Sequence, residues 1–254
     1  MSIRSATTHP ALRTQWRSFA IAIADNDAER ELAWRIRHDV FLAEMQGCPR
    51  ADGLERDDFD DEYDHVVVTI AATGEPVGTC RLVSSSSTGR FYSATEFAIE
   101  RFLQLPGTKI ELGRVCLCPA WRNNLALAAI GRAIGWYAQA HQAAWIFGCT
   151  SISTVEPRMA GMLNRHFAAL GACEVDLGIM PLAEHRLSDL RMDEPPDQPR
   201  LDTLISPLMR LYLKSGAKLG CEPALDRDFG CLDFFTMVDL TLHRKSILSR
   251  YVPC

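Results

Sequence analysis

A direct passage from a strand-like run into a helix constrains the fold of this chain more than any other feature. Within Lys109–Cys118, the residues after Lys109 are apolar apart from Glu111 and Arg114, and an amphipathic stretch over residues 123–141 follows. The N-terminus of a helix that follows a strand presents free backbone N–H groups, which bind anions. Two opposite charges within an apolar strand are costly unless they pair or take part in chemistry. The junction therefore predicts an α/β fold with a site for an anionic group.

The remaining pattern predicts a mixed sheet flanked by helices. We expect strands over residues 19–24, 65–71, 77–84, 109–118, 144–152, 173–180 and 232–238, and helices over 28–45, 123–141, 156–170, 208–215 and 244–250. Ser93–Glu96 fits a capping box that opens a short helix reaching about Leu103. The turn at Thr73–Pro76 requires antiparallel pairing, so the fold class is α/β (α+β) with a largely antiparallel sheet. We expect a lead-in over residues 1–15 and one domain over 16–254, with a polar, proline-rich excursion from about 184 to 207 that opens a C-terminal extension.

Composition excludes several classes of protein. The chain has 254 residues, 47% of them hydrophobic, and a net charge of -5, which argues against general nucleic-acid binding. Nine cysteines, several inside apolar runs, fit reduced thiols in a cytoplasmic protein better than disulfides. Cys116 and Cys118 lack a nearby cluster of histidines or cysteines, so we expect no metal site. The N-terminus lacks a signal-peptide core, and no apolar run reaches the ~20 residues of a membrane span.

Several motifs follow one another in a fixed order. They are Arg37-His-Asp-Val40-Phe41, Asp57-Asp-Phe-Asp60 with Asp64-His65, Gly78-Thr-Cys-Arg81-Leu82, Glu111-Leu-Gly-Arg114, Trp145–Ser151, Tyr212–Gly220, Asp226, Phe229 and Asp233-Phe234. Their order over about residues 30–250 resembles the ornithine-lipid-type N-acyltransferases of the GNAT superfamily, which are similar to acyl-homoserine-lactone synthases and N-acyl amino acid synthases. The resemblance implies a GNAT-like fold and transfer of an acyl chain to an amine.

One departure from the broader superfamily bears on the acyl donor. Where its phosphate loop has small residues after an Arg/Gln, Leu125 and Leu127 follow Arg122 here. Glycines at such positions let the backbone approach a pyrophosphate closely, so bulky residues disfavour coenzyme A. The resemblance then implies acyl carrier protein as donor, with no resident cofactor. Arg122 is expected to meet the phosphate of the phosphopantetheine arm, and the backbone N–H groups of Val115, Cys116 and Leu117 to hold the oxyanion if a bulge frees them.

Two charged residues of the central strand are the catalytic candidates. A protonated amine must lose its proton before it attacks a thioester, so a carboxylate base is useful. Glu111 is the candidate base, and Arg114 would hold and orient it. The alternative is that the two residues form a buried scaffold pair, with Arg81 as a further partner. His65 is a weaker candidate for a proton shuttle.

An ornithine acceptor needs groups of both charges. Arg37 and Arg81 are expected to bind its carboxylate, because arginine presents a planar fork. Asp57, Asp60 and Asp64 are the expected partners of its side-chain ammonium, and a solvated loop is the alternative for this acidic run. Phe91 and Phe97 are expected either to line an acyl tunnel or to pack in the core.

The leading interpretation is a cytoplasmic enzyme that moves a 3-hydroxyacyl or fatty acyl chain from acyl carrier protein to the α-amine of ornithine, which gives a lyso-ornithine lipid. N-acylation of another amino acid, acyl-homoserine-lactone synthesis and a lipid-binding protein without turnover are the alternatives. The expected docking patch for the acidic carrier protein is Lys109, Arg122 and Arg132. Arg244, Lys245 and Arg250 are the expected contacts for peripheral binding at the inner membrane.

Overall fold

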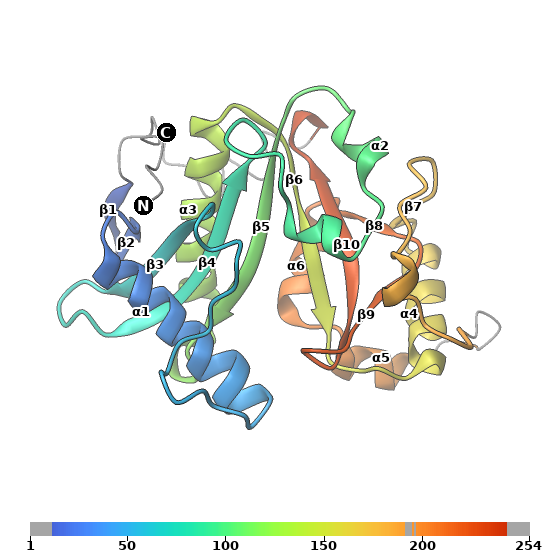
Figure 1. The fold of residues 1–254 in the computed structure, drawn as a ribbon, viewed down its shortest axis with the longest axis horizontal. Coiled ribbons are helices and arrows are strands. Elements are labelled where there is room, and N and C mark those ends of the chain that lie inside the picture. Colours follow the sequence, from blue (N-terminus) through green and yellow to red (C-terminus); the bar gives the residue numbers. More distant parts are fainter. Residues whose placement is uncertain (1–11, 191–194, 196, 243–254) are drawn as a thin grey trace. The chain divides into compact units, whose positions relative to one another are not determined.

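The computed structural model describes residues 12–190, 195 and 197–242 (Figure 1). The chain divides into two compact units. Of the described residues, unit 1 contains 12–83 and 113–142, and unit 2 contains 84–112 and those from 143 to 242. Strand β5 (Thr108–Leu117) is covalently part of both, because the boundary falls between Leu112 and Gly113.

Unit 1 is built on an antiparallel sheet. Its strands are β1 (Arg13–Trp16), β2 (Phe19–Ile23), β3 (Asp64–Ile70) and β4 (Pro76–Ser84), and each pairs with the next in the chain. In β3 and β4, buried residues follow one another without alternation. A strand with this pattern is covered on both faces. Figure 1 agrees, since α1 lies in front of these strands and α3 behind them.

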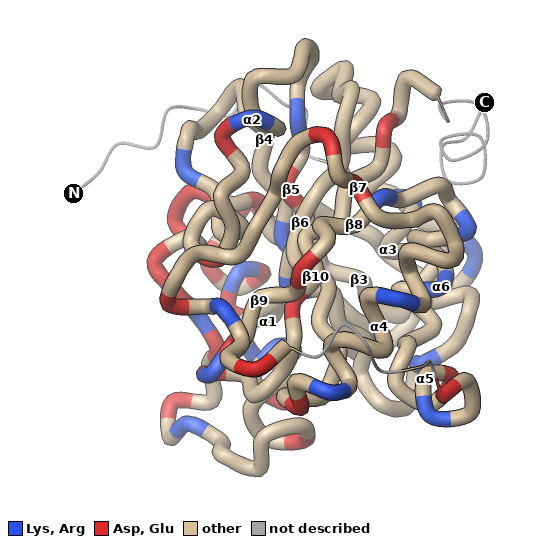
Figure 2. The backbone as a smooth tube through the Cα atoms, turned by 90° about the vertical axis from the view of Figure 1, so that its right-hand side faces the viewer, with Lys and Arg blue, Asp and Glu red and all other residues tan. Residues whose placement is uncertain are grey.

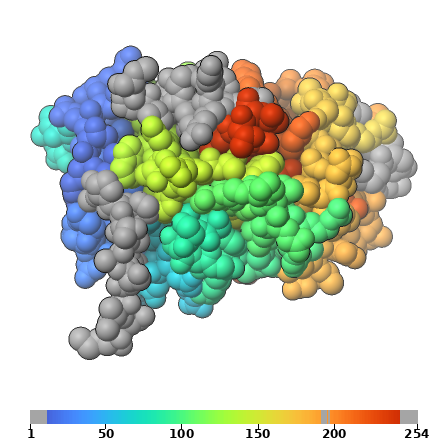
Figure 3. All heavy atoms as spheres, turned by 90° about the horizontal axis from the view of Figure 1, so that it is seen from above, coloured from blue at the N-terminus to red at the C-terminus, as the bar shows by residue number. Residues whose placement is uncertain are grey.

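The helices of unit 1 begin at side-chain caps. Asn26 accepts a hydrogen bond from the Glu29 N–H at the start of α1 (Asp27–Arg37), which continues as the π-helical segment η1 (His38–Met45). After the 3₁₀ turn η3 (Pro119–Trp121), Asn123 caps α3 (Asn124–Ala140). This helix packs on β2 and β3. In Figure 3 its yellow-green atoms lie at the surface beside the blue N-terminal elements.

Unit 2 contains a mixed sheet. The first part of β5 pairs in parallel with β6 (Ala143–Ile152), and β6 pairs antiparallel with β10 (Cys231–Asp239). The short strands β8 (Lys218–Gly220) and β9 (Ala224–Asp226) both pair antiparallel with β10, and β7 (Cys173–Glu174) pairs in parallel with β8.

The two faces of this sheet pack against different partners. One face meets α4 (Pro157–Ala169), α5 (Gln198–Leu204) and α6 (Pro207–Lys214) in a core that includes Leu163, Leu201, Met209 and Phe234. Figure 2 marks charges of both signs on α5. The other face carries Phe147 and Phe235, which pack with aromatic residues of the segment 91–103.

Most of the predicted elements are confirmed, and the fold class is the predicted mixed, largely antiparallel sheet flanked by helices. Ser93–Glu96 does not open a helix to Leu103. It lies in a 3₁₀ turn, η2 (Tyr92–Thr95), and a separate four-residue helix α2 (Glu100–Leu103) follows. The Ser93 hydroxyl donates to Glu111 instead of capping a helix.

Two other expectations need correction. The strand expected over residues 173–180 is limited to β7. The excursion from 184 to 207 contains the 3₁₀ turn η4 (Ala183–His185) and α5, whose Leu201 is buried in the core. Strands β1, β8 and β9 were not predicted. Residues 1–11 of the expected lead-in and the helix expected over 244–250 lie outside the described residues. Among the described helices, none is long and apolar enough to cross a membrane.

Candidate functional site

A buried arginine at the end of α1 starts a network of ion pairs in unit 1. The Arg37 side chain is fully buried and donates through Nε to Glu55. Its two terminal nitrogens donate to the two oxygens of Asp60, at 2.7 and 3.0 Å. Such a bidentate contact fixes the plane of both groups. Arg37 therefore holds the loop after η1 against the end of α1.

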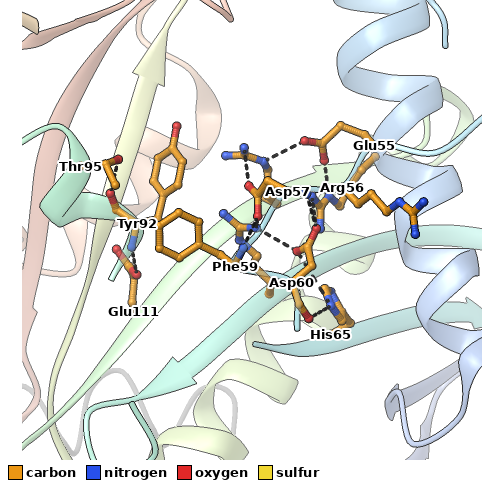
Figure 4. A network of polar contacts seen from close by, with 12 residues as sticks. Glu55, Arg56, Asp57, Phe59, Asp60, His65, Tyr92, Thr95 and Glu111 are labelled. Carbon is orange, nitrogen blue, oxygen red and sulfur yellow. Dashed lines mark hydrogen bonds and ion pairs between the residues drawn. The ribbon is translucent and has the colours of Figure 1, made fainter. Parts of the chain in front are cut away.

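Two further arginines close the network into a ring (Figure 4). Arg81 on β4 donates through Nη1 to Asp60 at 2.8 Å and to Asp57 at 2.6 Å. Arg114 on β5 donates to the other Asp57 oxygen at 3.1 Å and to Glu55 at 3.3 Å. Each of the three carboxylates thus bridges two of the three arginines. We call Arg37, Arg81, Arg114, Glu55, Asp57 and Asp60 the charge ring.

The charge ring contains three positively and three negatively charged side chains, and this balance affects the pKa values of its aspartates. Burial alone would raise the pKa of Asp60, but the hydrogen bond to Arg37 and the charges of Arg37 and Arg81 outweigh it and hold the pKa well below its ordinary value. The pKa of Asp57 is lowered for the same reason, by Arg81 and Arg114. His65 donates through Nε2 to the Asp60 carbonyl, 3.2 Å away, and burial lowers its pKa to about 4. His65 is therefore neutral near pH 7.

Local backbone geometry brings the ring together. Arg114 has φ +52°, a left-handed conformation that is uncommon for a residue with a side chain and interrupts the regular course of β5. The preceding residue, Gly113, lies beside Arg81, whose Nε is 3.6 Å from where a Cβ would be. The Asp57 N–H donates to Asp60 at 2.9 Å, which tightens the turn that carries both carboxylates.

The expected donor-binding residues lie at the end of β5 and the start of α3. Arg122 makes two hydrogen bonds to Glu44, at 2.8 and 2.6 Å, and about half of its side chain is exposed. The Asn123 side chain accepts from the N–H groups of Leu125 and Ala126, both at 3.0 Å. Cys116, between Val115 and Leu117, is buried beside Ile36 and Val40, and burial raises the pKa of its thiol.

The other catalytic candidate, Glu111, belongs to unit 2. Its carboxylate accepts from the Tyr92 N–H at 2.8 Å and from the Ser93 N–H and hydroxyl at 2.6 and 2.5 Å. Figure 4 shows this contact with the 3₁₀ turn η2. Glu111 is 2% exposed, and these hydrogen bonds join the turn to β5. Phe91 and Phe97 next to the turn pack on Phe147 and Phe235.

The structure gathers some of the predicted site residues and separates others. Arg37, Arg81, Arg114, Asp57 and Asp60 meet in the charge ring, whereas Asp64 accepts a hydrogen bond from the Tyr137 hydroxyl at 2.8 Å. Sequence reasoning missed Glu55, which links Arg37 to Arg114. Its position at the start of the acidic run 55–64 was the available signal.

The expected docking residues have partners of their own. The Lys109 ammonium donates to the carbonyls of Leu105 and Gly107, at 2.5 and 3.0 Å. The Arg132 guanidinium lies 5.1 Å from the centre of the Trp16 ring. Arg122 is the most accessible of the three charges that we expected to face an acidic carrier protein.

Comparison with known proteins identifies the class. Residues 36–132 match the family model described as an acetyltransferase (GNAT) domain. This range includes all six residues of the charge ring. The crystal structure of the AHL synthase LasI superposes with a TM-score of 0.52 at 11% identity, covering 93% of this chain and 97% of that one, which supports the fold. The chain is an acyltransferase with a GNAT domain.

The names of similar proteins are more specific than the description of the domain. The L-ornithine N(alpha)-acyltransferase of Rhizobium meliloti (strain 1021) is 29% identical over 255 residues, covering 94% of this chain and 86% of the relative. The protein of the same name from Rhodobacter capsulatus is 28% identical over 240 residues, covering 87% and 90%. The resemblance to the ornithine-lipid-type N-acyltransferases is thereby confirmed.

Proposed function

We propose that this protein transfers a fatty or 3-hydroxyfatty acyl chain from acyl carrier protein to the α-amine of ornithine, with lyso-ornithine lipid as the product. The observation that carries the proposal is the similarity to relatives named L-ornithine N(alpha)-acyltransferase along nearly the whole chain. The charge ring supports it, because it joins motifs spread over residues 37–114 in one buried network.

The start of α3 supports a carrier protein rather than coenzyme A as donor. A pyrophosphate at a helix N-terminus needs free N–H groups. Here the N–H groups of Leu125 and Ala126 already bond to Asn123, and the Leu125 side chain is 46% exposed at this position. The phosphopantetheine arm of a carrier protein has a single phosphate. Arg122 can bind it by exchanging its exposed contact with Glu44.

The proposed reaction is direct attack on the thioester. The amine nitrogen forms a bond to the acyl carbon, the carbon–sulfur bond breaks, and the phosphopantetheine thiolate leaves. A base takes the proton from the amine, and the proton then passes from the base to the thiolate. The left-handed residue Arg114 precedes Val115, Cys116 and Leu117, whose N–H groups are the proposed oxyanion donors. Arg114 itself holds Glu55 and Asp57, and we assign it a positioning role.

Glu111 has two proposed roles, base and scaffold, and one variant separates them. Three donors already occupy its oxygens, so a base role requires it to release the Ser93 hydroxyl. In Glu111→Gln, loss of the base would lower kcat by roughly 10²–10⁴-fold with the melting temperature little changed. Loss of the scaffold would lower the melting temperature and leave kcat within about tenfold. Ser93→Ala, which removes one donor and no base, is the matched control.

Mass spectrometry of the reaction product tests the proposed function. The purified chain is incubated with 3-hydroxyhexadecanoyl and hexadecanoyl acyl carrier protein, all amino acids, ornithine and S-adenosylmethionine. N-acyl ornithine is expected. Formation of a different N-acyl amino acid would change the assigned acceptor. Formation of an acyl-homoserine lactone would overturn the proposed function. Product formed only from acyl coenzyme A would overturn the donor assignment.

The product is amphipathic, so we propose that it is released at a membrane surface. Arg244, Lys245 and Arg250 are the basic residues assigned to that contact from the sequence. Co-sedimentation with anionic vesicles, compared for the wild type and a triple Gln variant, tests this.

A further inference from the structure

One face of the sheet in unit 2 carries an unusual row of polar groups. Glu111 on β5 is aligned with Phe147 on β6, and Ser151, four residues later on β6, is aligned with Asp233 on β10. Side chains at alternate positions of a strand share a face, so Cys149 lies between Phe147 and Ser151 on this face. The turn η2 bonds to the same face through Glu111.

Acidic side chains gather at one end of this row. An oxygen of Glu96, the Cys149 sulfur and an oxygen of Asp233 lie within 4.8 Å of one another. Asp233 is also part of a second group within that distance, with Asp226 and Cys231. Glu96 and Asp233 are only 2% and 3% exposed. Three carboxyl groups thus share a small buried region, which we call the acidic cluster.

The Glu96 carboxyl differs from the carboxylates of the charge ring in the groups that surround it. The strongest influences on the Glu96 carboxyl are burial, Asp233, Tyr92 and Asp226, and none of these is a basic group. The Glu96 Oε2 atom has no hydrogen-bond partner among the described residues. Burial, followed by the charge of Asp233, raises the pKa of Glu96 to about 9. The carboxyl has side-chain hydrogen bonds with Tyr92 and Asp233, but a buried oxygen without a donor is costly, so Oε2 is suited to accept a hydrogen bond from a cation.

An amino acid acceptor with two amines needs a hydrogen-bond acceptor for its side-chain ammonium. In unit 1 the carboxylates of Glu55, Asp57 and Asp60 already bridge arginines. We propose that Glu96 and Asp233 bind the side-chain ammonium of the acceptor and so select a diamino acid. This inference rests on the proposed function. On binding, the ammonium donates to both carboxylates and Glu96 releases its proton to solvent.

An alkylammonium fits the cluster better than a metal ion does. Zinc-binding thiols must be thiolates. Here burial raises the pKa of the Cys149 and Cys231 thiols, and Cys149 donates to the Ser93 hydroxyl. Asp226 already accepts from the N–H groups of Asp228 and Phe229, so it caps a turn. Cys149 is half-buried and Ser151 exposed, so the part of β6 beside the cluster reaches the surface.

Calorimetric titration of the full chain with L-ornithine and with L-norvaline tests the inference. Norvaline has the same carbon chain without the terminal ammonium. The wild type should bind ornithine at least about tenfold more tightly, the typical effect of a charged hydrogen bond. In Asp233→Asn and Glu96→Gln the ratio should fall towards one, with norvaline affinity retained as proof of folding. Asp233→Glu should recover part of the ratio.

The control is Glu100→Gln, which removes an exposed negative charge in the same unit and should keep the wild-type ratio. Equal weakening of both ligands in Asp233→Asn, or a wild-type ratio near one, would overturn the subsite. A stoichiometric metal in the wild type that is lost in Asp233→Asn, measured by plasma mass spectrometry, would overturn it as well.

The acylation assay separates the two proposals. One outcome is that N-acyl ornithine forms while the ratio of its yield to that of N-acyl norvaline stays the same in the Glu96 and Asp233 variants as in the wild type. In that case the subsite is wrong and the proposed function stands. If no acyl ornithine forms although ornithine binding depends on Asp233, the subsite stands and the proposed function is wrong.

Discussion

The charge ring and the acidic cluster are both buried and both contain three carboxyl groups, but different groups act on those carboxyls: arginines on Asp57 and Asp60 in the ring, and burial and neighbouring carboxyls on Glu96 in the cluster. In the ring each carboxylate touches two arginines, and the pKa values of Asp57 and Asp60 are lowered. In the acidic cluster the pKa of Glu96 is raised to about 9. Asp57 and Asp60 are therefore charged and paired with arginines near pH 7, whereas the Glu96 carboxyl keeps its proton. The difference indicates scaffold in the first case and a ligand site in the second.

Removing one cation from the ring should have the largest effect. Arg37→Met leaves Glu55 and Asp60 buried with one partner fewer, and breaking a buried pair costs roughly 3–5 kcal/mol. Urea unfolding measures the loss. The control is Arg35→Met on the same helix, whose i,i+4 pair with Glu31 is exposed and worth about 0.3–0.5 kcal/mol. Equal losses in the two variants would contradict the distinction between buried and exposed pairs.

Stability should depend on pH with opposite sign in the two regions. The folded pKa of Glu96 is raised, so the unfolded chain releases this proton more easily, and stability falls as pH rises from about 4.5 through 9. His65 and Asp60 have lowered pKa values, so their contribution falls with acid, from pH 6.5 towards 4 for His65 and below about 4 for Asp60.

Melting temperatures across pH 4–9 measure both limbs. Glu96→Gln should flatten the alkaline limb only, and His65→Gln the limb between pH 6.5 and 4. If Glu96→Gln left the alkaline limb unchanged, the raised pKa of Glu96 would be contradicted.

Removing one partner of an exposed ion pair should have the smallest effect on stability. Glu44→Gln removes the exposed partner of Arg122 and should cost about 0.2–1 kcal/mol. Because it frees Arg122, it should also lower KM for the acyl carrier protein donor, while Arg122→Gln raises it. A stability loss as large as that of Arg37→Met would show that charge balance matters at the surface as much as in the interior.

The sequence predicted the long elements of this fold well. The run from Lys109 to Cys118 and the helix after Asn123 are confirmed because periodicity and caps are local signals. Strands β8 and β9 have three residues each, too few for a pattern. Ser93–Glu96 matched a capping box, but the Ser93 hydroxyl bonds to Glu111, a partner that only the tertiary fold supplies.

The site was less accessible to prediction. Five of the six ring residues were candidates, yet their mutual pairing depends on the left-handed turn at Arg114. Glu55 looked like any other member of an acidic loop. Asp226 and Asp233 were noted only as parts of a motif, and nothing in the sequence placed Glu96 beside them.

The order in which the ring residues occur along the chain has a consequence for synthesis. Arg37, Glu55, Asp57, Asp60 and Arg81 leave the ribosome first, and Arg114 follows only after Ser84–Leu112, which belongs to unit 2. Until then three carboxylates share two arginines, so the nascent ring carries an excess negative charge. At ≈ 5–20 residues per second the interval between Arg81 and Arg114 lasts a few seconds. Unit 1 is thus completed by a residue made late, and β5 couples the folding of both units.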